Sequence, residues 1–502
     1  MNANAADYFL DRHIREGRGG RLAFIDPTRR LTYADLLAAA QGFAAGLAQA
    51  GLKPGARVAM LLPDTVDFPI VFWGALRAGL LPVPLNTLLP PGHIFSALDD
   101  CGAEILIACP TLLPALASGL AARPELRHVI ATGEQLACFM MPGAHAPVVC
   151  REDDLAFLLY SSGSTSEPKG VVHRHAALRA TAETYAAEVL NLQADDVVFS
   201  VAKLFFAYGL GNAMSFPMSV GACAVLLPGR PTPEAVLALM AAHAPTIFFA
   251  VPTFFATLLN GAPLGRGAGS PRLRLCVSAG EALPSHVGEA WQQATGLDIL
   301  DGIGSTEMLH IFISNTPAAL RYGTSGIAVP GYGLRVVDEQ GRDVQDGELG
   351  ELLVQGPSAA LGYWRHVENT RITFLDGWVR TGDKYLREPD GFYRYCGRSG
   401  DVFKVGGIWV SPFDVETALV AHAAVLEAAV VAYRDADGLL KPRAFVVLKA
   451  GAEASPELIA ELQCFVKART GPWKYPRRVE IVATLPKTAT GKIQRFRLRE
   501  TV

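Results

Sequence analysis

Short apolar segments alternate with longer amphipathic segments along most of the chain, and this alternation constrains the fold more than any other feature. Residues 57–63 and 104–109 have the apolar character of buried strands, whereas residues 67–79 and 92–102 have the spacing of amphipathic helices. The same order returns after residue 155. A repeated β-α-β-α order predicts a parallel or mostly parallel sheet with helices on its faces.

The pattern changes near residue 325. Residues 332–356 show the short alternating segments and glycines typical of β-hairpins, and strand and helix patterns with their own apolar core follow Gly400. The sequence therefore predicts an α/β protein with two domains. We expect a large N-terminal domain of mixed β-sheets flanked by helices, residues 1–399, and a small α+β C-terminal domain, residues 400–502.

Composition excludes several function classes. The net charge of −3 over 502 residues gives no general attraction to nucleic acid or to anionic membranes. The eight cysteines include no Cys-x-x-Cys pair, which favours a reducing compartment over a disulfide scaffold or a zinc site. The most apolar stretch, residues 245–259, is too short to span a bilayer and contains Pro252. We expect a cytoplasmic protein that binds neither nucleic acid nor membrane, with its oligomeric state open and a homodimer as one alternative.

Residues 160–170 form a loop suited to phosphate. Gly163 lets the backbone approach an anion closely, and Lys169 adds a positive charge. The loop is not a P-loop, because Lys169 precedes Gly170 and no Gly-Lys pair is present. Its hydroxyl donors are Ser161, Ser162, Ser164 and Thr165. Taken alone, these residues fit either a phosphate-binding loop or a polar surface connection between a strand and a helix.

Three further loops each carry one charged residue that suits a nucleotide. Glu307 follows a run of small residues at the end of an expected strand, where a carboxylate can help to hold Mg²⁺ beside phosphates. Asp383 lies in an expected tight turn and could accept from both ribose hydroxyls, although an Asx-turn cap explains an aspartate equally well. Lys492 follows a glycine near the C-terminus, where a solvated surface lysine is the alternative.

Five segments together resemble one family. Residues 160–170, 301–308, 378–385, 395–407 and 486–495 occur in the order and spacing of the adenylate-forming superfamily, which includes acyl- and aryl-CoA ligases, luciferases and the adenylation domains of peptide synthetases. The resemblance covers nearly the whole chain. It implies ATP, Mg²⁺ and coenzyme A as ligands, and a small C-terminal domain that is mobile because it rotates between two half-reactions.

The resemblance also implies roles for single residues. Thr165 and Glu307 would bind Mg²⁺, and Lys492 would act in adenylation, whereas Lys404 would reach the site for the second half-reaction. Gly400 would be the hinge, although the family usually has an acidic residue at this position. The residues implied at ATP or AMP are Ser161, Ser162, Gly163, Ser164, Thr165, Lys169, Ala279, Gly280, Glu281, Asp301, Gly302, Ile303, Gly304, Ser305, Thr306, Asp383 and Arg398.

The acceptor of the acyl group is expected to be free coenzyme A, because no carrier-protein domain follows Lys492 in this sequence. A solvated basic face with one packed tryptophan explains part of the expected CoA site equally well. Two alternatives stay open: an adenylating enzyme that loads a separate carrier protein, and a non-catalytic nucleotide-binding protein with the same fold. The residues expected at CoA are Gly406, Gly407, Trp473, Lys474 and Arg477.

Residues 202–222 indicate which class of carboxylic acid is the substrate. Peptide-synthetase domains carry an aspartate in this region that pairs with the ammonium group of an amino acid, and this sequence has no acidic residue there. Residues 204–212 and 305–312 resemble benzoate–CoA ligases and their close relatives. The implied substrate is benzoate or a ring-substituted benzoate such as 2-aminobenzoate, whose planar ring suits aromatic and small walls. The implied pocket residues are Ala207, Tyr208, Gly304, His310 and Ile311.

Overall fold

The computed structural model describes residues 3–160, 169–261, 264–406, 408–487 and 493–499. The chain divides into two compact units. The first comprises Met1–Tyr322, Ala328–Gly333 and Gln355–Val379, and the second comprises Gly323–Ile327, Leu334–Val354 and Arg380–Val502. The expected hinge at Gly400 lies inside the second unit, and the domain boundary expected there stays a prediction.

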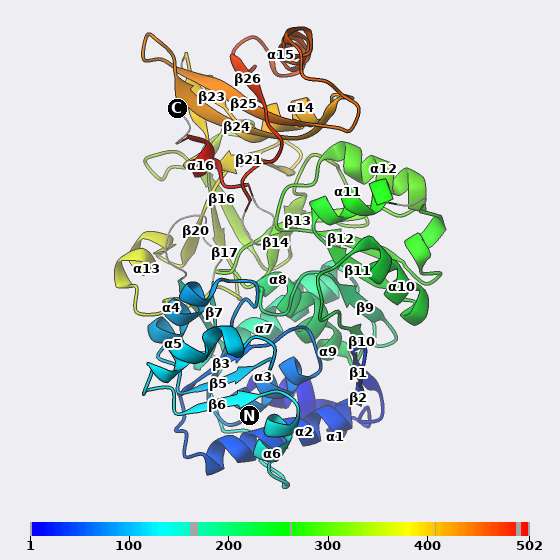
Figure 1. Ribbon diagram of the computed structural model, residues 1–502, viewed down its shortest axis with the longest axis vertical. Coiled ribbons are helices and arrows are strands. Elements are labelled where there is room, and N and C mark those ends of the chain that lie inside the picture. The colour runs from blue at the N-terminus through cyan, green and yellow to red at the C-terminus, as the bar shows by residue number, and fades with distance from the viewer. Residues whose placement is uncertain (1–2, 161–168, 262–263, 407, 488–492, 500–502) are drawn as a thin grey trace. The chain divides into compact units, whose positions relative to one another are not determined.

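A nine-stranded sheet is the largest sheet of the structure (Figure 1). In sheet order its strands are β15 (Ile327–Ala328), β14 (Ile311–Ser314), β13 (Ile299–Gly304), β12 (Leu275–Ser278), β11 (Ile247–Ala250), β9 (Val197–Ser200), β10 (Cys223–Val225), β1 (Leu22–Ile25) and β2 (Arg30–Thr32). The neighbours β9, β11, β12 and β13 are parallel, and β13 pairs antiparallel with β14. The carboxyl ends of four strands therefore meet at one edge, where ligands bind in α/β folds.

Two smaller sheets belong to the first unit. One is parallel and has the order β4 (Leu81–Pro84), β3 (Arg57–Leu61), β5 (Ile105–Ala108) and β6 (His128–Ala131). The other is antiparallel and has the order β18 (Gly362–Tyr363), β8 (Gly170–Arg174) and β7 (Leu155–Tyr160). Strand β8 follows the expected phosphate loop and is the central strand of this antiparallel sheet. It pairs with β18, so Val171 lies directly beside Tyr363.

Local signals start several helices of the first unit. Thr32 begins α2 with a capping box: its hydroxyl accepts from the Asp35 N–H at 3.1 Å, and the Asp35 carboxylate accepts from the Thr32 N–H at 3.0 Å. The helical segments of this unit are η1 (Asp7–Asp11), α1 (Arg12–Arg15), α2 (Tyr33–Gln49), α3 (Asp67–Arg77), α4 (Pro91–Cys101), η2 (Pro114–Leu116), α5 (Ala117–Ala121), α6 (Glu134–Phe139), α7 (His175–Thr181), η3 (Ala182–Val189), α8 (Ala207–Leu210), η4 (Gly211–Ser215), α9 (Phe216–Val220), α10 (Pro233–His243), α11 (Pro252–Gly261), η5 (Arg266–Gly269), α12 (Ser285–Thr295) and α13 (Val367–Thr373).

The chain after residue 333 is rich in strands. A five-stranded sheet contains β16 (Gly333–Val337), β17 (Gly350–Gln355), β19 (Phe374–Leu375), β20 (Trp378–Arg387) and β21 (Tyr393–Arg398). A hairpin follows, then a three-stranded sheet whose apolar core includes Leu419 and Leu462 from two helices. These elements are β22 (Phe403–Val405), β23 (Ile408–Val410), α14 (Pro412–Val420), β24 (Val425–Arg434), β25 (Leu440–Leu448), α15 (Pro456–Thr470), β26 (Arg478–Ile481) and α16 (Arg495–Arg499).

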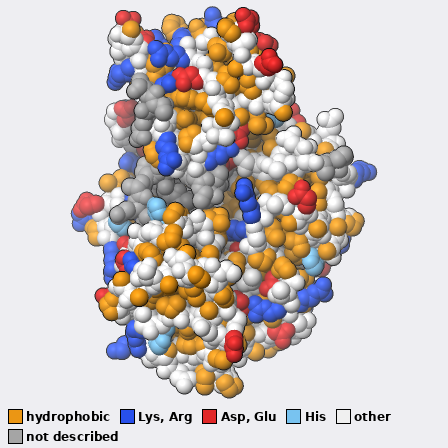
Figure 2. Space-filling model, viewed as in Figure 1, with side chains coloured by type: hydrophobic (Ala, Val, Ile, Leu, Met, Phe, Trp, Pro, Cys, Tyr) orange, Lys and Arg blue, Asp and Glu red, His pale blue; other side chains and the backbone are white. Residues whose placement is uncertain are grey.

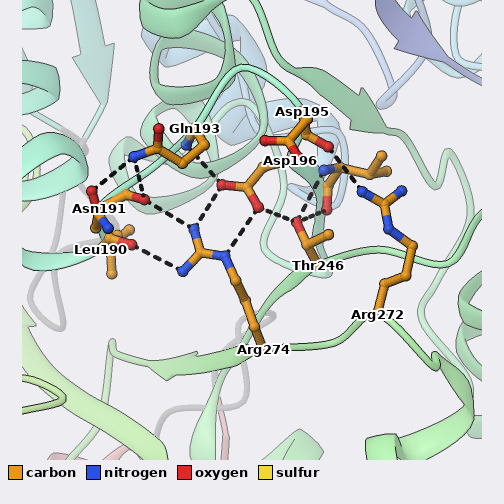
Figure 3. A network of polar contacts seen from close by, with 9 residues as sticks. Leu190, Asn191, Gln193, Asp195, Asp196, Thr246, Arg272 and Arg274 are labelled. Atoms are coloured by element: carbon orange, nitrogen blue, oxygen red, sulfur yellow. Dashed lines mark hydrogen bonds and ion pairs between the residues drawn. The ribbon is translucent and has the colours of Figure 1, made fainter.

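A polar network ties three central strands together at their amino ends (Figure 3). Asp196, Thr246 and Arg274 directly precede β9, β11 and β12. Arg274 donates to both carboxylate oxygens of Asp196 at 3.1 and 2.6 Å, and the Thr246 hydroxyl donates to the same carboxylate at 2.6 Å. Burial alone would raise the pKa of Asp196, but these hydrogen bonds outweigh burial and lower it. The network fixes the strands at the edge opposite to their carboxyl ends.

Most elements agree with the sequence predictions, and one local prediction was wrong. The strands expected at residues 57–63 and 104–109 are β3 and β5. Asp383, however, lies within strand β20 and pairs with Arg398 of β21, not in a tight turn. Gly382 has a turn-like φ of 72°, but pairing with β21 keeps Asp383 in the strand.

The surface shows no extended basic region on the face in Figure 2, where lysine and arginine side chains form small separate groups among hydrophobic and uncharged atoms. None of the helices in the described part of the chain combines the length and apolar character that crossing a bilayer requires.

Candidate active site

Two of the segments implied at ATP or AMP, residues 279–281 and 301–306, lie on neighbouring strands. Residues 279–281 follow β12, and residues 301–306 form the end of β13 and the two positions after it. The two strands are parallel, and Ser278, the last residue of β12, is paired with Asp301. Gly280 has a φ of 93°, so a side chain at this position would strain the turn after β12. The structure therefore brings the two predicted segments together at one edge of the sheet.

Asp301 is buried, with only 4% of the residue exposed. Its Oδ2 accepts a hydrogen bond from the Leu283 N–H at 3.2 Å, which connects β13 to the loop after β12. Burial raises the pKa of Asp301 to about 8, although the hydrogen bond from Leu283 opposes the shift. The carboxyl group is therefore mainly protonated at neutral pH, and it shapes the 279–283 loop without adding charge.

The backbones of β13 and β14 approach closely. Gly304 pairs with Ile311, and a Cβ atom at Gly304 would lie only 2.5 Å from the His310 carbonyl oxygen. A Cβ at Gly302 would lie 2.8 Å from the Ile313 carbonyl oxygen. Glycine at these positions thus allows His310 and Ile311, two expected pocket residues, to reach the end of β13.

Tyr208, in the segment before β10, also lies beside His310. Its ring centre lies 5.5 Å from that of His310, and its hydroxyl donates to the Val277 carbonyl oxygen at 3.2 Å. Ala207 precedes it as the first residue of α8. The structure therefore brings together Tyr208, His310 and the Gly304–Ile311 pair, and their role as an acid pocket stays a prediction.

His310 is a buried, neutral ring. Desolvation by burial lowers its pKa to about 3. Its Nε2 lies 3.0 Å from Asn212 Oδ1, and a Cβ at Gly211 would be 2.4 Å from its Cδ2. Because an amide oxygen only accepts, Nε2 carries the proton in this pair. His310 therefore adds no charge to the pocket expected for the aryl acid.

Lys169 and Glu307 are connected through one aromatic residue. The Tyr363 hydroxyl donates to Glu307 Oε1 at 2.7 Å. Lys169 Nζ lies 5.5 Å from the centre of the same ring. The structure thus places the expected phosphate lysine and the expected Mg²⁺ ligand around Tyr363.

The donor set at Glu307 fits Mg²⁺ rather than a metal cage. In the described ranges, no three or more His, Cys, Asp and Glu side chains gather as a metal site. Mg²⁺ commonly takes one or two protein carboxylates and fills its other positions with phosphate oxygens and water. A single carboxylate beside the expected phosphate loop meets that need. Magnesium at Glu307 therefore stays a prediction, and the donor chemistry fits it.

In the second unit, the expected ribose-binding residues form an ion pair. Arg398 Nε lies 3.2 Å from Asp383 Oδ1, and Asp383 is buried whereas Arg398 is half exposed. Arg398 also donates to the Thr381 carbonyl oxygen at 3.1 Å. Their pairing across β20 and β21 orients the carboxylate.

The residues expected at CoA also belong to this unit. Lys404 Nζ lies 4.4 Å from the ring centre of Trp409. A Cβ at Gly406 would lie 3.9 Å from the Trp473 ring, which is 51% exposed. Lys474 pairs with Asp414 at 3.6 Å, and the Arg477 guanidinium lies 3.6 Å from the ring centre of Tyr475. Gly406 and Trp473 are thus brought together, whereas Lys474 and Arg477 each have partners within the unit.

The expected hinge touches the C-terminal helix. Arg499 donates to the Gly400 carbonyl oxygen at 3.2 Å and to the Asp401 carboxylate. Arg495 lies 3.7 Å from Asp401 and donates to Glu416.

Seven predicted site residues lie outside the described residues: Ser161, Ser162, Gly163, Ser164, Thr165, Gly407 and Lys492.

The sequence reasoning missed three residues that hold the site. Asn212 is one helical turn after Tyr208, a spacing that could have identified it. Tyr363 is 56 residues from Glu307 in sequence, and no pattern links them. Buried Asp64 accepts from the Leu204 N–H at 3.1 Å and so anchors the segment before Tyr208, again without a sequence signal.

Family models match most of the chain. The model described as AMP-binding enzyme matches residues 10–364, and the model described as AMP-binding enzyme C-terminal domain matches residues 414–492. A 4-hydroxybenzoate–CoA/benzoate–CoA ligase of Rhodopseudomonas palustris is 51% identical over 99% of this chain and 94% of its own length.

Two solved structures share the fold over the whole chain. A benzoate CoA ligase from Burkholderia xenovorans LB400 has a TM-score of 0.91 and 47% identity, with 99% of each chain covered. An anthranilate CoA ligase in complex with anthranoyl-AMP has a TM-score of 0.93 and 40% identity, covering 100% of this chain and 99% of its own. The predicted α/β fold is confirmed by these matches.

Replacing Asp301 by Asn should remove a pH dependence of stability. The folded state keeps this carboxyl protonated up to about pH 8, whereas the unfolded carboxyl ionises near its ordinary value. The unfolded state therefore binds fewer protons in this window, so the free energy of unfolding falls as pH rises, by at most about 1.4 kcal/mol per unit. The Asn variant stays neutral, and its unfolding free energy in urea should fall less between about pH 5.5 and about pH 8.

The matched control is the same change at exposed Asp298, which should leave the pH dependence as in the parent. If the parent and the Asp301→Asn variant lose stability equally with rising pH, the protonated state assigned to Asp301 is wrong.

Proposed function

We propose, because this chain belongs to the AMP-binding enzyme family, that it is an ATP-dependent ligase that joins an aromatic carboxylic acid to coenzyme A through an aroyl-AMP intermediate. One observation carries the proposal: Tyr208, neutral His310 and the Gly304–Ile311 pair meet at the strand edge where the nucleotide segments begin. The likeness to an anthranilate CoA ligase with bound anthranoyl-AMP supports the same type of intermediate.

The proposed reaction has two displacements at different atoms. First, a carboxylate oxygen of the acid attacks the α-phosphorus of ATP, and the bond from phosphorus to the bridging oxygen breaks to release pyrophosphate. Then the sulfur of CoA, having lost its proton, attacks the acyl carbon, and AMP leaves. Mg²⁺, when bound, neutralises charge on the phosphate oxygens.

The nucleotide is assigned to three segments of the first unit. Residues 161–165 and Lys169 bind the β- and γ-phosphates. Residues 279–281 and 301–306 enclose the adenine and the α-phosphate. Support comes from their geometry, because β12 and β13 end side by side and Glu307 is connected to Lys169 through Tyr363. Glu307 and Thr165 are proposed as the Mg²⁺ ligands.

The second unit is proposed to supply the remaining groups. Asp383, oriented by Arg398, accepts from the ribose hydroxyls. Lys492 stabilises the developing charge of adenylation. Rotation at Gly400 then exchanges Lys492 for Lys404, and the side-chain-free Gly406 and Gly407 admit the narrow pantetheine arm of CoA. Trp473, Lys474 and Arg477 are proposed at the CoA nucleotide.

The substrate class follows from size and charge. The wall of Tyr208, His310 and Ile311 is aromatic and apolar, and it carries no group that would pair with an ammonium ion. We therefore assign benzoate or a small ring-substituted benzoate. A cytoplasmic location is also proposed, because none of the eight cysteines, all of which lie in the described residues, forms a disulfide bond, as is usual in a reducing compartment. A homodimer stays a prediction.

The purified protein, given ATP, Mg²⁺ and CoA, should convert benzoate, 2-aminobenzoate or a hydroxybenzoate to the CoA thioester. Thioester, AMP and pyrophosphate should form in equal amounts, while octanoate, which is too long for the wall at Tyr208 and His310, should give little product. Pyrophosphate release without any CoA ester would indicate a separate carrier protein as the acceptor. No pyrophosphate release with any acid would exclude adenylation and leave a nucleotide-binding protein.

Replacing His310 by Ala should change the ranking among ring-substituted benzoates. The imidazole packs against Tyr208, so its removal opens space beside the proposed ring position, and differences of one small group are worth about 1–3 kcal/mol in such pockets. Initial rates with each acid should show bulkier acids gaining relative to benzoate. The half-saturating ATP concentration, measured in the same assays, should stay within about twofold and is the internal control. An unchanged ranking would show that the acid binds elsewhere.

A further inference from the structure

Glu307 is held at two points by one short segment. The Ala360 N–H donates to the Glu307 carbonyl oxygen at 2.8 Å. The Tyr363 hydroxyl donates to the Glu307 carboxylate at Oε1, at 2.7 Å. Both the backbone and the side chain of Glu307 are therefore positioned by residues 360–363.

Tyr363 is itself fixed by the sheet that carries the expected phosphate lysine. Tyr363 pairs with Val171 in the β18–β8 ladder, and the adjacent Trp364 N–H donates to the Gly170 carbonyl oxygen at 2.7 Å. The Tyr363 N–H donates to Thr370 Oγ1 at 2.9 Å. The ring also meets Phe374 edge-on, with centres 5.7 Å apart. The phenol consequently has little freedom to leave Glu307.

The same ring contacts a cation. Lys169 Nζ lies 5.5 Å from its centre, within the range of a cation–π contact. Tyr363 thus touches two charged groups of opposite sign that the proposed function puts at the phosphates of ATP. The ring and the hydroxyl serve these two contacts separately, so the two roles can be tested apart.

A carboxylate that binds a metal ion works best when its orientation is set before the ion arrives. Partners that hydrogen-bond such a ligand hold its orientation, and losing one typically weakens metal binding. The Tyr363 hydroxyl occupies one oxygen of Glu307 and leaves the second oxygen for another partner. A phenol is also neutral, so it orients the carboxylate without cancelling its charge.

We propose that Tyr363 is a positioning residue for adenylation, whose hydroxyl orients Glu307 toward Mg²⁺ and the phosphates of ATP. This inference rests on the proposed function, which assigns Glu307 to the metal. It predicts an effect on Mg²⁺ binding and on the first half-reaction, and none on the transfer of the acyl group to CoA.

The test is Tyr363→Phe, which removes one hydroxyl and keeps the ring against Phe374 and Lys169. Titration of Mg²⁺ into the protein with α,β-methylene ATP, whose methylene bridge prevents release of pyrophosphate, should show binding about tenfold weaker than in the parent. The Mg²⁺ concentration for half-maximal aroyl-AMP formation should rise by a similar factor. Thioester formation from supplied aroyl-AMP and CoA should stay within about twofold of the parent.

The matched control is Tyr322→Phe. The Tyr322 hydroxyl also donates to a carboxylate, that of Asp298 at 2.9 Å, but Asp298 precedes β13 whereas Glu307 follows it. This control should leave the Mg²⁺ titration unchanged.

In a Glu307→Gln background, Tyr363→Phe should weaken Mg²⁺ binding little further, because the effects of residues that act through one another are not additive.

Two outcomes would overturn the inference. One is a Mg²⁺ affinity of Tyr363→Phe equal to that of the parent, even if the thermal stability of the variant is lower. The other is an equal loss in both half-reactions. The proposed function is judged separately: if the parent forms no aroyl-AMP, that proposal fails, whereas a parent that forms it and a variant with normal Mg²⁺ binding refute only the role of Tyr363.

Discussion

The close approach of β13 to β14 is the constraint on which the rest of the site depends. A Cβ atom at Gly304 would lie 2.5 Å from the His310 carbonyl oxygen, a distance at which one backbone would have to move. Because glycine is present, His310 and Ile311 sit against the end of the strand from which Glu307 departs. On the buried part of the same strand, Asp301 holds the loop after β12. One strand therefore positions the expected wall of the aryl-acid pocket, an expected nucleotide loop and the expected metal ligand.

Charge is distributed unevenly around this strand. Burial keeps Asp301 protonated and His310 uncharged near neutral pH, so both contribute shape and hydrogen bonds without net charge. Glu307 and Lys169 are arranged around the neutral phenol of Tyr363. An uncharged wall next to a charged segment suits a reaction that brings an aromatic ring and a polyphosphate together, because each part of the substrate meets the environment that binds it.

The sequence predicted the strands and the strand-end loops well, because buried parallel strands leave continuous apolar runs and β12 and β13 are of that kind. It did not predict the contacts that orient the site. The bonds from Tyr363 to Glu307 and from Leu204 to Asp64 join residues far apart in sequence, and no local periodicity encodes them. Asp383 was expected in a tight turn, whereas pairing with β21 keeps it in a strand. Tertiary pairing outweighed the local signal.

The proposed function puts the aryl ring and the adenylate in a single site at the end of β13. A crystal structure with an uncleavable aroyl-adenylate analogue, in which a sulfamate replaces the phosphate, tests this most directly. We predict that the ring lies between Tyr208 and the Gly304–Ile311 pair, with the adenine at residues 279–281. Electron density for the ring away from Tyr208 and His310, or for the adenine away from the loop that Asp301 anchors, would contradict the account.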